Sequence, residues 1–320
     1  MSIYYVISDS IGCLEMTVKR FGLLKKNFGL YILALPGLVF LIVFSFFPMY
    51  SHLLAFKDFV PRLGIWGSDW VLFENFKFFF SGGIWKQITF NTLYLNLLFI
   101  TFTIITALAI AIFVDDIGGK LLRRFLQSSV FLPYFVSWLV VQMLVLAMLS
   151  QTNGIINMLI KQAGGATVPF FSLPEIWPAI LTFLYVWKHA GYYSIIFLSV
   201  IISIPPEHFE AAKIDGATRV QQIRYITLPM LKGTVIILVF LSIGRIFYGD
   251  FGMIYGIIGD NGALYDTTEV IDTYAYRALR FYGSFSMAAA VTLFQSVMGM
   301  ITVVIFNMLV KKIDNNYRIF

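Results

Sequence analysis

The sequence predicts an all-α integral membrane protein whose chain crosses the bilayer six times. Hydrophobic residues make up 59% of the 320 residues and charged residues only 12%, whereas roughly a quarter of an average soluble domain is charged. Six long apolar stretches, nearly free of charge, each exceed the roughly 20 residues that a spanning helix needs. The net charge of +6 then indicates basic flanks at the cytoplasmic membrane surface rather than a nucleic-acid partner.

Residues 1–27 are predicted to form an N-terminal cytoplasmic tail. Their positive charges follow a short apolar run, whereas a secretory signal places its positive charges first and ends at a small-residue cleavage site. The tail is therefore expected to stay attached, either lying partly on the membrane surface or disordered. A second cytoplasmic tail is predicted at 311–320.

The transmembrane domain is predicted to cover 28–310, with polar connections between its spans. The connection at 57–86 is rich in Trp, Phe and Gly, which favours an aromatic belt at the membrane interface over a sugar-binding surface. Turn residues at 151–175 predict an external loop, with one short amphipathic helix at 155–162. Pro133 predicts a kink in the third span, where neighbouring helices can satisfy the freed carbonyl. The six spans are expected at about 28–56, 88–114, 125–149, 176–203, 233–258 and 283–310.

The distribution of basic residues predicts how these spans are oriented. Connections on the cytoplasmic side of a membrane protein are enriched in Lys and Arg. Most of the 23 basic residues fall near the two termini, in the turn at 115–124 and in the loop at 204–232. This pattern places both termini and both of these connections in the cytoplasm.

The loop at 204–232 is polar, whereas nearly everything around it is apolar, and its local signals predict an ordered structure. Two prolines at its start suit the first turn of a helix, where the N–H that proline lacks would be unpaired anyway. Gly216 tolerates the left-handed conformation that commonly ends a helix. Thr218, with a glutamine three residues later, has the spacing of a capping box. Two short helices are therefore expected to meet at a glycine elbow, the second running up to Pro229.

Three short motifs follow one another in this loop: Glu-Ala-Ala at 210–212, a glycine at 216, and Ile-x-Leu-Pro at 226–229. Together they resemble the EAA loop of permease subunits in bacterial type I ABC importers. The extended form, Glu-Ala-Ala-x-x-Asp-Gly-Ala followed by Ile-Thr-Leu-Pro, is similar to that of the carbohydrate-importer branch. Leu-Ala-Leu-Pro-Gly at 33–37 and Phe-Phe-Pro at 46–48 resemble permeases for complex oligosaccharides. The resemblance covers roughly residues 28–312.

The resemblance implies the type I permease fold and a transmembrane subunit of an ATP-driven importer in the bacterial cytoplasmic membrane. It implies four kinds of partner: a second homologous permease, two ATP-binding-cassette ATPase subunits, an extracytoplasmic solute-binding protein and an oligosaccharide cargo. The first helix of the loop would sit in a cleft of an ATPase subunit and transmit its closure to the spans. The positions that would dock there are Glu210, Ala211, Ala212, Asp215 and Gly216.

Two cations stand deep in the predicted spans. Lys188 and Arg245 each lie about twelve residues into a helix, which places them near mid-membrane at 1.5 Å per residue, where charges usually face protein or a watery cavity. Tyr185 and Tyr192 share the helical face of the lysine, and Tyr248 that of the arginine. Aromatic faces beside polar donors suit sugar rings. We predict that these five residues line the translocation path and that the cations favour carboxylate-bearing, uronate-containing oligosaccharides.

The sequence also limits the chemistry of the chain itself. It contains no G-x-x-x-x-G-K-S/T phosphate loop, so we expect ATP and Mg to be bound by the partner ATPase subunits and not by this chain. One cysteine and three widely separated histidines predict neither a disulfide nor a metal site. No combination of nucleophile, base and orienting group emerges. The chain is therefore not expected to be an enzyme or to need a cofactor of its own.

Other interpretations stay open from the sequence alone. Lys188 and Arg245 would be structural if they pair with Asp250 or with a partner subunit. An ion-coupled secondary carrier would want acidic residues inside its spans, and Asp250 is the only clear one. A membrane scaffold would need neither a polar path nor a docking loop. An importer of small solutes such as glycerol phosphate stays within the family, because the loop motif does not encode cargo.

Overall fold

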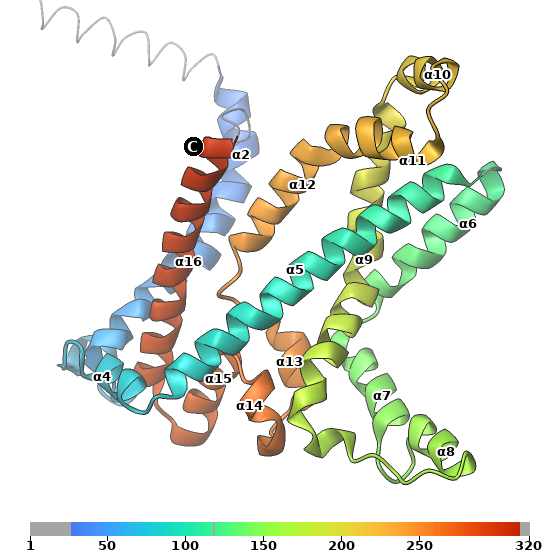
Figure 1. Cartoon of the computed structure of the whole chain (residues 1–320). Coiled ribbons are helices and arrows are strands. Elements are labelled where there is room, and N and C mark those ends of the chain that lie inside the picture. Colours follow the sequence, from blue (N-terminus) through green and yellow to red (C-terminus); the bar gives the residue numbers. More distant parts are fainter. Residues whose placement is uncertain (1–26, 118, 314–320) are drawn as a thin grey trace, which may run out of the picture. The chain divides into compact units, whose positions relative to one another are not determined.

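The computed structural model describes residues 27–117 and 119–313, most of which lie in helices (Figure 1). Most of the predicted N-terminal tail, residues 1–26, lies outside the described residues. The chain forms two compact units, Met1–Leu53 and Leu54–Phe320.

The first unit contains the first predicted span. Here α2 (Phe28–Leu41) continues into a π-helical turn, η1 (Ile42–Phe46), and into the 3₁₀ helix η2 (Phe47–Phe56), which runs past the end of the unit. The whole segment, Phe28–Phe56, is long and apolar enough to cross a membrane. Its bounds coincide with those predicted from the run without charges.

Long helices form the centre of the second unit, and their small residues allow close packing. Ala107 and Ala111, one turn apart on α5, are buried against α9 and α12, since small side chains let helix backbones approach each other. On α9, a Cβ at Gly191 would lie 2.0 Å from the carbonyl oxygen of Val130, so only glycine fits there. The long helices include α5 (Ile84–Asp116), α9 (Trp177–Ser203), α12 (Leu228–Ile243) and α16 (Phe285–Ile313).

The third predicted span is sharply bent rather than kinked. Here α6 (Lys120–Phe131) and the 3₁₀ helix η3 (Leu132–Phe135) turn by 95° before α7 (Trp138–Leu149) begins. Ser137 caps α7 by accepting a hydrogen bond from the N–H of Val140. The proline in η3 cannot donate to the helix, which explains why a break occurs, and the serine cap explains why a new helix starts in another direction.

The fifth predicted span differs more from expectation. Its helix begins earlier, at Arg219, and runs through α11 (Arg219–Gln222), the π-helical turn η6 (Ile223–Thr227) and α12. The π turn precedes Pro229, so the proline bends the ladder without ending the helix there. The helix instead stops at Ile243, and α13 (Phe251–Ile258) is separate. Residues 233–258 are therefore two helices with a non-helical break between them.

Among the described residues, four helical segments are long and apolar enough to span a membrane singly, and six if each of two bent pairs counts as one span. The chain is thus a multi-pass membrane protein. The predicted short helix at 155–162 is confirmed as α8 (Ile155–Gln162). The two-residue strands β1 and β2 pair antiparallel, which a run rich in aromatics and glycine did not predict. The other short elements are β1 (Lys57–Asp58), α3 (Gly64–Gly67), β2 (Asp69–Trp70), α4 (Glu74–Ser81), η4 (Phe170–Ser172), η5 (Pro174–Ile176), η7 (Gly262–Leu264), α14 (Tyr265–Thr268) and α15 (Ile271–Tyr282).

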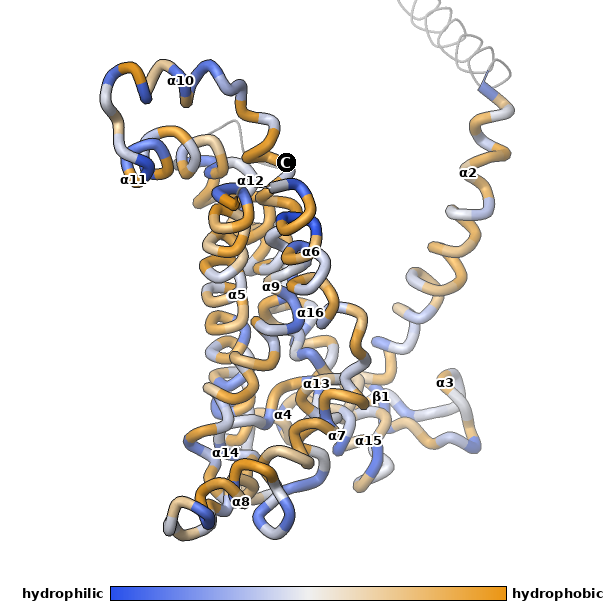
Figure 2. The backbone as a smooth tube through the Cα atoms, turned by 90° about the vertical axis from the view of Figure 1, so that its right-hand side faces the viewer, coloured by the Kyte–Doolittle hydropathy of each residue, from blue (hydrophilic) through white to orange (hydrophobic). Residues whose placement is uncertain are grey.

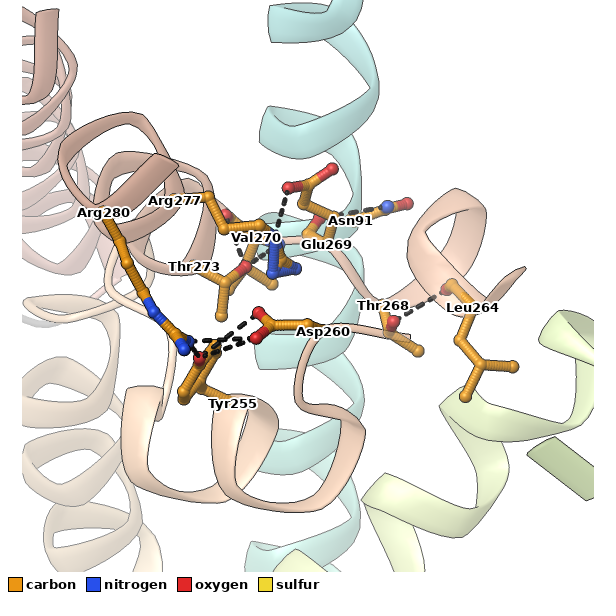
Figure 3. A network of polar contacts seen from close by, with 10 residues as sticks. All are labelled: Asn91, Tyr255, Asp260, Leu264, Thr268, Glu269, Val270, Thr273, Arg277 and Arg280. Atoms are coloured by element: carbon orange, nitrogen blue, oxygen red, sulfur yellow. Dashed lines mark hydrogen bonds and ion pairs between the residues drawn. The ribbon is translucent and has the colours of Figure 1, made fainter. Parts of the chain in front are cut away.

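A buried polar network fixes α14 and α15 against α5 (Figure 3). Arg277 and Glu269 are both buried and form an ion pair of 3.3 Å, while the guanidinium lies 3.8 Å from the ring centroid of Tyr265. Asn91 of α5 donates to the carbonyl oxygen of Glu269 at 3.1 Å. Burial raises the pKa of the Glu269 carboxyl, and the neighbouring arginine opposes that rise. This network holds the segment after α13 in a defined position.

Candidate functional site

The first candidate site is the docking loop, residues 204–232, which contains α10 (Pro206–Ile214). Gly216 adopts φ +78°, and the N–H of Ala217 returns to the carbonyl oxygen of Ala212 at 2.8 Å, which closes the helix end. Thr218 and Gln221 form the expected capping box at the start of α11. The predicted short first helix, glycine elbow and capping box are therefore confirmed. The predicted end of the second helix at Pro229 is wrong, because that helix continues to Ile243.

The docking loop stands out from the helices as an exposed surface (Figure 1). No residue of α10 is buried. In Figure 2, hydrophilic and hydrophobic residues alternate along α10 and α11. Three large apolar side chains of the loop are strongly exposed, and such groups on a monomer surface commonly mark a protein contact. They are Ile214 at 87%, Val220 at 73% and Tyr225 at 69%.

The predicted docking residues lie together on this surface. Glu210, Ala211, Asp215 and Gly216 are exposed, and Ala212 is half-buried. The exposed apolar neighbours were not singled out from the sequence, because an apolar residue in an amphipathic helix is normally assigned to its packed face. Only the structure shows that Ile214, Val220 and Tyr225 remain exposed instead.

The second candidate site is a polar cavity of about 590 Å³ beside the break between α12 and α13. Three predicted path residues line it: Arg245, Tyr185 and Tyr248. The phenol of Tyr248 is fixed by a 3.2 Å hydrogen bond with Ser296 of α16. The complete lining is Asn96, Ile100, Tyr185, His189, Tyr193, Leu241, Ser242, Arg245, Tyr248, Gly249, Asp250, Phe251 and Asp272.

The structure does not bring Lys188 and Tyr192 to this cavity. Lys188 is buried, and its Nζ donates to the carbonyl oxygens of Tyr134, at 2.8 Å, and Val136. These carbonyls belong to the bend between α6 and α7, where the helical ladder is interrupted. Tyr192 stacks on Tyr134 with ring centroids 4.8 Å apart. The lysine therefore has the structural role that was considered as an alternative, but its partners are carbonyls rather than Asp250.

Arg245 is the one cation among the residues that line the polar cavity, and it is exposed. Within the described part of the chain, its side chain makes no hydrogen bond or ion pair. Two carboxylates also line the cavity, but both already accept hydrogen bonds from the protein. Asp250 accepts from Trp138 Nε1 at 3.1 Å and from the N–H of Met253 at 3.0 Å. The guanidinium is thus the charged group that is free to meet a solute.

The carboxylate of Asp272 likewise accepts two hydrogen bonds from the protein. It accepts from the N–H of Gly249 at 2.5 Å and from Gln295 Nε2 at 2.8 Å. Burial raises the pKa of its carboxyl, and the donated hydrogen bonds oppose this rise. Asn96 of α5 donates to the carbonyl oxygens of Ile246 and Tyr248 at 3.0 and 3.1 Å. Sequence reasoning missed these two residues, although a lone amide inside a predicted span was an available signal.

Another cavity, of about 520 Å³, lies between α7, α8 and α9. Its lining consists of apolar side chains, including Val145, Ile180 and Trp187. Without donors or acceptors, it has nothing to orient a sugar hydroxyl. The polar cavity is therefore the better candidate for a solute path.

Comparison with known proteins identifies the kind of membrane protein to which both sites belong. Residues 100–315 match the family described as binding-protein-dependent transport system inner membrane component. The chain belongs to this family. The permease is 33% identical to protein LplB of Bacillus subtilis (strain 168), over 91% of each chain. It is also 33% identical to the polygalacturonan/rhamnogalacturonan transport system permease protein YteP of the same organism, over 88% of each chain.

Solved structures agree with this assignment. A chain of a bacterial ABC transporter involved in the import of the acidic polysaccharide alginate superposes on the permease with a TM-score of 0.84 and 30% identity, covering 92% of this chain and 99% of that one. A chain of the alginate transporter in complex with an alginate pentasaccharide-bound periplasmic protein gives a TM-score of 0.81 at 30% identity, with 91% and 96% covered. The predicted type I importer permease fold is confirmed. The chain is the membrane-spanning subunit of an ABC importer, a translocation subunit and not itself an enzyme, which removes the ion-coupled carrier as its function.

Proposed function

We propose that this permease imports acidic, uronate-containing oligosaccharides. The observation that carries the proposal is the free guanidinium of Arg245 in the polar cavity, beside Tyr185 and Tyr248. A planar guanidinium binds a carboxylate through two parallel hydrogen bonds, and the tyrosine rings offer apolar faces to a sugar. The similarity to permeases named for polygalacturonan and alginate transport supports this class of cargo.

The cavity's own carboxylates do not oppose an acidic cargo strongly. Asp250 and Asp272 each accept two hydrogen bonds from the protein, which hold both carboxylates in place. Arg245 has no such partner among the described residues. A uronate carboxylate entering the cavity would therefore meet a cation that has no hydrogen-bond or ion-pair partner in the described part of the chain and two carboxylates that already accept hydrogen bonds from the protein.

Energy would come from separate subunits that bind the docking loop. In this proposal α10 enters a cleft of one ATPase subunit through Glu210, Ala211, Ala212, Asp215 and Gly216, and ATP with Mg is held by two ATPase subunits. The exposure of α10 and of Ile214 supports this contact. A second homologous permease would complete the path, and an extracytoplasmic solute-binding protein would deliver the cargo.

This arrangement orients the permease in the bacterial cytoplasmic membrane. The docking loop and both termini would face the cytoplasm, where the ATPases are. The turn that joins α5 to α6 lies at the same end as α10 in Figure 1. Basic residues cluster at the start of α6 and recur along the docking loop: Lys120, Arg123 and Arg124, and Lys213, Arg219, Arg224 and Lys232. Such clusters favour the cytoplasmic side.

Transport by the reconstituted complex tests the proposal. The complete importer, with its own binding protein, is placed in liposomes and given trigalacturonate or a neutral galactose trisaccharide. We expect Arg245→Gln to lower the acidic-to-neutral uptake ratio by about tenfold, because a hydrogen bond to a charged group contributes about 1.5–3 kcal/mol. Arg224→Gln is the matched control, since it removes an exposed charge outside the cavity. An unchanged ratio in Arg245→Gln, or preference of the native importer for the neutral sugar, contradicts the proposal.

A further inference from the structure

Three charged residues at the loop end of the second unit stand at positions that their own helices do not favour. Asp115 and Asp116 are the last residues of α5, and Arg219 is the first residue of α11. A helix C-terminus disfavours negative charge and an N-terminus disfavours positive charge, because of the aligned peptide dipoles. The helix dipoles therefore do not explain why these charges stand at these positions, but the contacts among the charged residues do.

Arg219 bridges both aspartates. Its Nε donates to Asp116 Oδ1 at 2.6 Å, and its Nη2 contacts Asp116 Oδ1 and lies 3.2 Å from Asp115 Oδ2. The guanidinium carbon also lies 5.9 Å from the ring centroid of Phe209 on α10. One side chain thus connects the start of α11, the docking helix and the end of α5.

Arg123 extends the cluster to α6. Its Nη2 donates to the carbonyl oxygen of Asp115 at 2.5 Å and lies 3.4 Å from the Oδ1 of the same residue. Asp115 is therefore shared by two arginines, one from α6 and one from α11. We call Asp115, Asp116, Arg123 and Arg219 the charge clamp.

The charge clamp contributes little to the folding stability of the protein. Its side chains are 21–41% exposed, and partly exposed ion pairs contribute little to folding. The buried contacts of α5 with α9 and α12 hold this part of the fold instead. The position of the charge clamp indicates its role, because it connects the docking loop to the 115–124 turn. Among the described residues, every hydrogen bond or ion pair between the docking loop and the 115–124 turn is made by Arg219.

We propose that Arg219 is a positioning residue that couples movement of the docking loop to α5 and α6. The helix that begins at Arg219 continues without interruption to Ile243, so movement of α10 reaches α12 through the chain itself. The charge clamp passes the same movement directly to the ends of the second and third spans. This inference rests on the proposed docking of an ATPase at α10.

The test uses the complete importer, purified with its ATPase and reconstituted with its binding protein. Arg219→Asp breaks the clamp, and Arg219→Asp combined with Asp116→Arg exchanges the two charges while keeping the pair. Arg124→Asp is the matched control, because this exposed arginine lies at the same end of the fold but outside the docking loop and makes no ion pair among the described residues. The readouts are the amount of ATPase retained on the permease and the number of cargo molecules transported per ATP hydrolysed.

We expect Arg219→Asp to retain the ATPase and to lower cargo transported per ATP by about fivefold, a size typical of residues that modulate coupling. The charge exchange should recover most of this loss, and Arg124→Asp should keep the native value. Unchanged coupling in Arg219→Asp, an equal loss in the control, no recovery in the exchange, or release of the ATPase by Arg219→Asp overturns the inference. If the native chain itself retains no ATPase, the proposed function fails, and the clamp fails with it.

Discussion

Two breaks interrupt apolar helical segments of this permease, and a cation lies at each. Lys188 reaches the first break from α9, and Arg245 belongs to the second break itself. At the break between α6 and α7 the chain turns by 95°. The carbonyl oxygens of Tyr134 and Val136 accept hydrogen bonds from Lys188 there. The lysine is buried, and its Nζ donates two hydrogen bonds to the backbone.

At the break between α12 and α13, other side chains form hydrogen bonds with the backbone groups that the interrupted helix leaves unpaired. Asn96 donates to the carbonyl oxygens of Ile246 and Tyr248, and Asp272 accepts from the N–H of Gly249. Neutral and acidic side chains thus satisfy this backbone, and Arg245 is left facing the polar cavity.

The comparison shows that depth in the membrane does not decide the role of a charged residue. Lys188 and Arg245 lie at similar depths in their predicted spans, but only one is available to a solute. The two residues differ because, at the break beside Arg245, other side chains already form hydrogen bonds with the free backbone groups, whereas at the other break Lys188 itself does so. Three substitutions test this distinction, from the largest expected effect on stability to the smallest.

Lys188→Met should destabilise the protein most. It leaves two buried carbonyl oxygens without a donor, and losing hydrogen bonds from a charged group costs about 2–3 kcal/mol. Thermal unfolding of the detergent-purified chain measures the effect, with Lys232→Met, at an exposed position, as the control. Native stability in Lys188→Met would mean that this lysine does not hold the bend between α6 and α7.

Asn96→Leu should have a smaller but clear effect. The substitution is close in volume and removes the donor to two carbonyls of the break between α12 and α13, for an expected loss of about 1–2 kcal/mol. The same unfolding assay applies, with Asn153→Leu at an exposed position as the control. If the two variants unfold alike, the break is maintained by something other than this amide.

Arg245→Gln should leave stability almost unchanged, within about 0.5 kcal/mol, because an exposed side chain without an intramolecular partner is removed. Its unfolding temperature should match that of the native chain even though its cargo preference changes. A loss as large as that of Lys188→Met would show that the arginine has a structural partner.

Parts of the fold were predictable because their causes are local. The elbow at Gly216 and the cap at Thr218 follow from the residues themselves, and α8 follows from its amphipathic pattern between turn residues. The apolar runs likewise predicted the long helices, since a charge inside a span is costly in any fold.

The rest depends on contacts between distant segments. Nothing near Ile243 forbids a helix to 258, and the helix ends where Asn96 and Asp272, far away in sequence, satisfy the backbone. The depth of Lys188 was predictable, but its hydrogen-bond partners were not. The carbonyl oxygens of Tyr134 and Val136 are available only because α7 begins in a new direction after the bend. The charge clamp joins residues about a hundred positions apart and leaves no pattern in the sequence.

The most direct test of the account compares the two cations in one uptake assay. Lys188→Gln and Arg245→Gln are each reconstituted with the complete importer, and uptake of trigalacturonate is divided by uptake of the neutral trisaccharide. We expect the ratio to fall about tenfold in Arg245→Gln and to keep its native value in Lys188→Gln, even if total uptake by the lysine variant is low. A ratio that falls in Lys188→Gln, or stays native in Arg245→Gln, would contradict it.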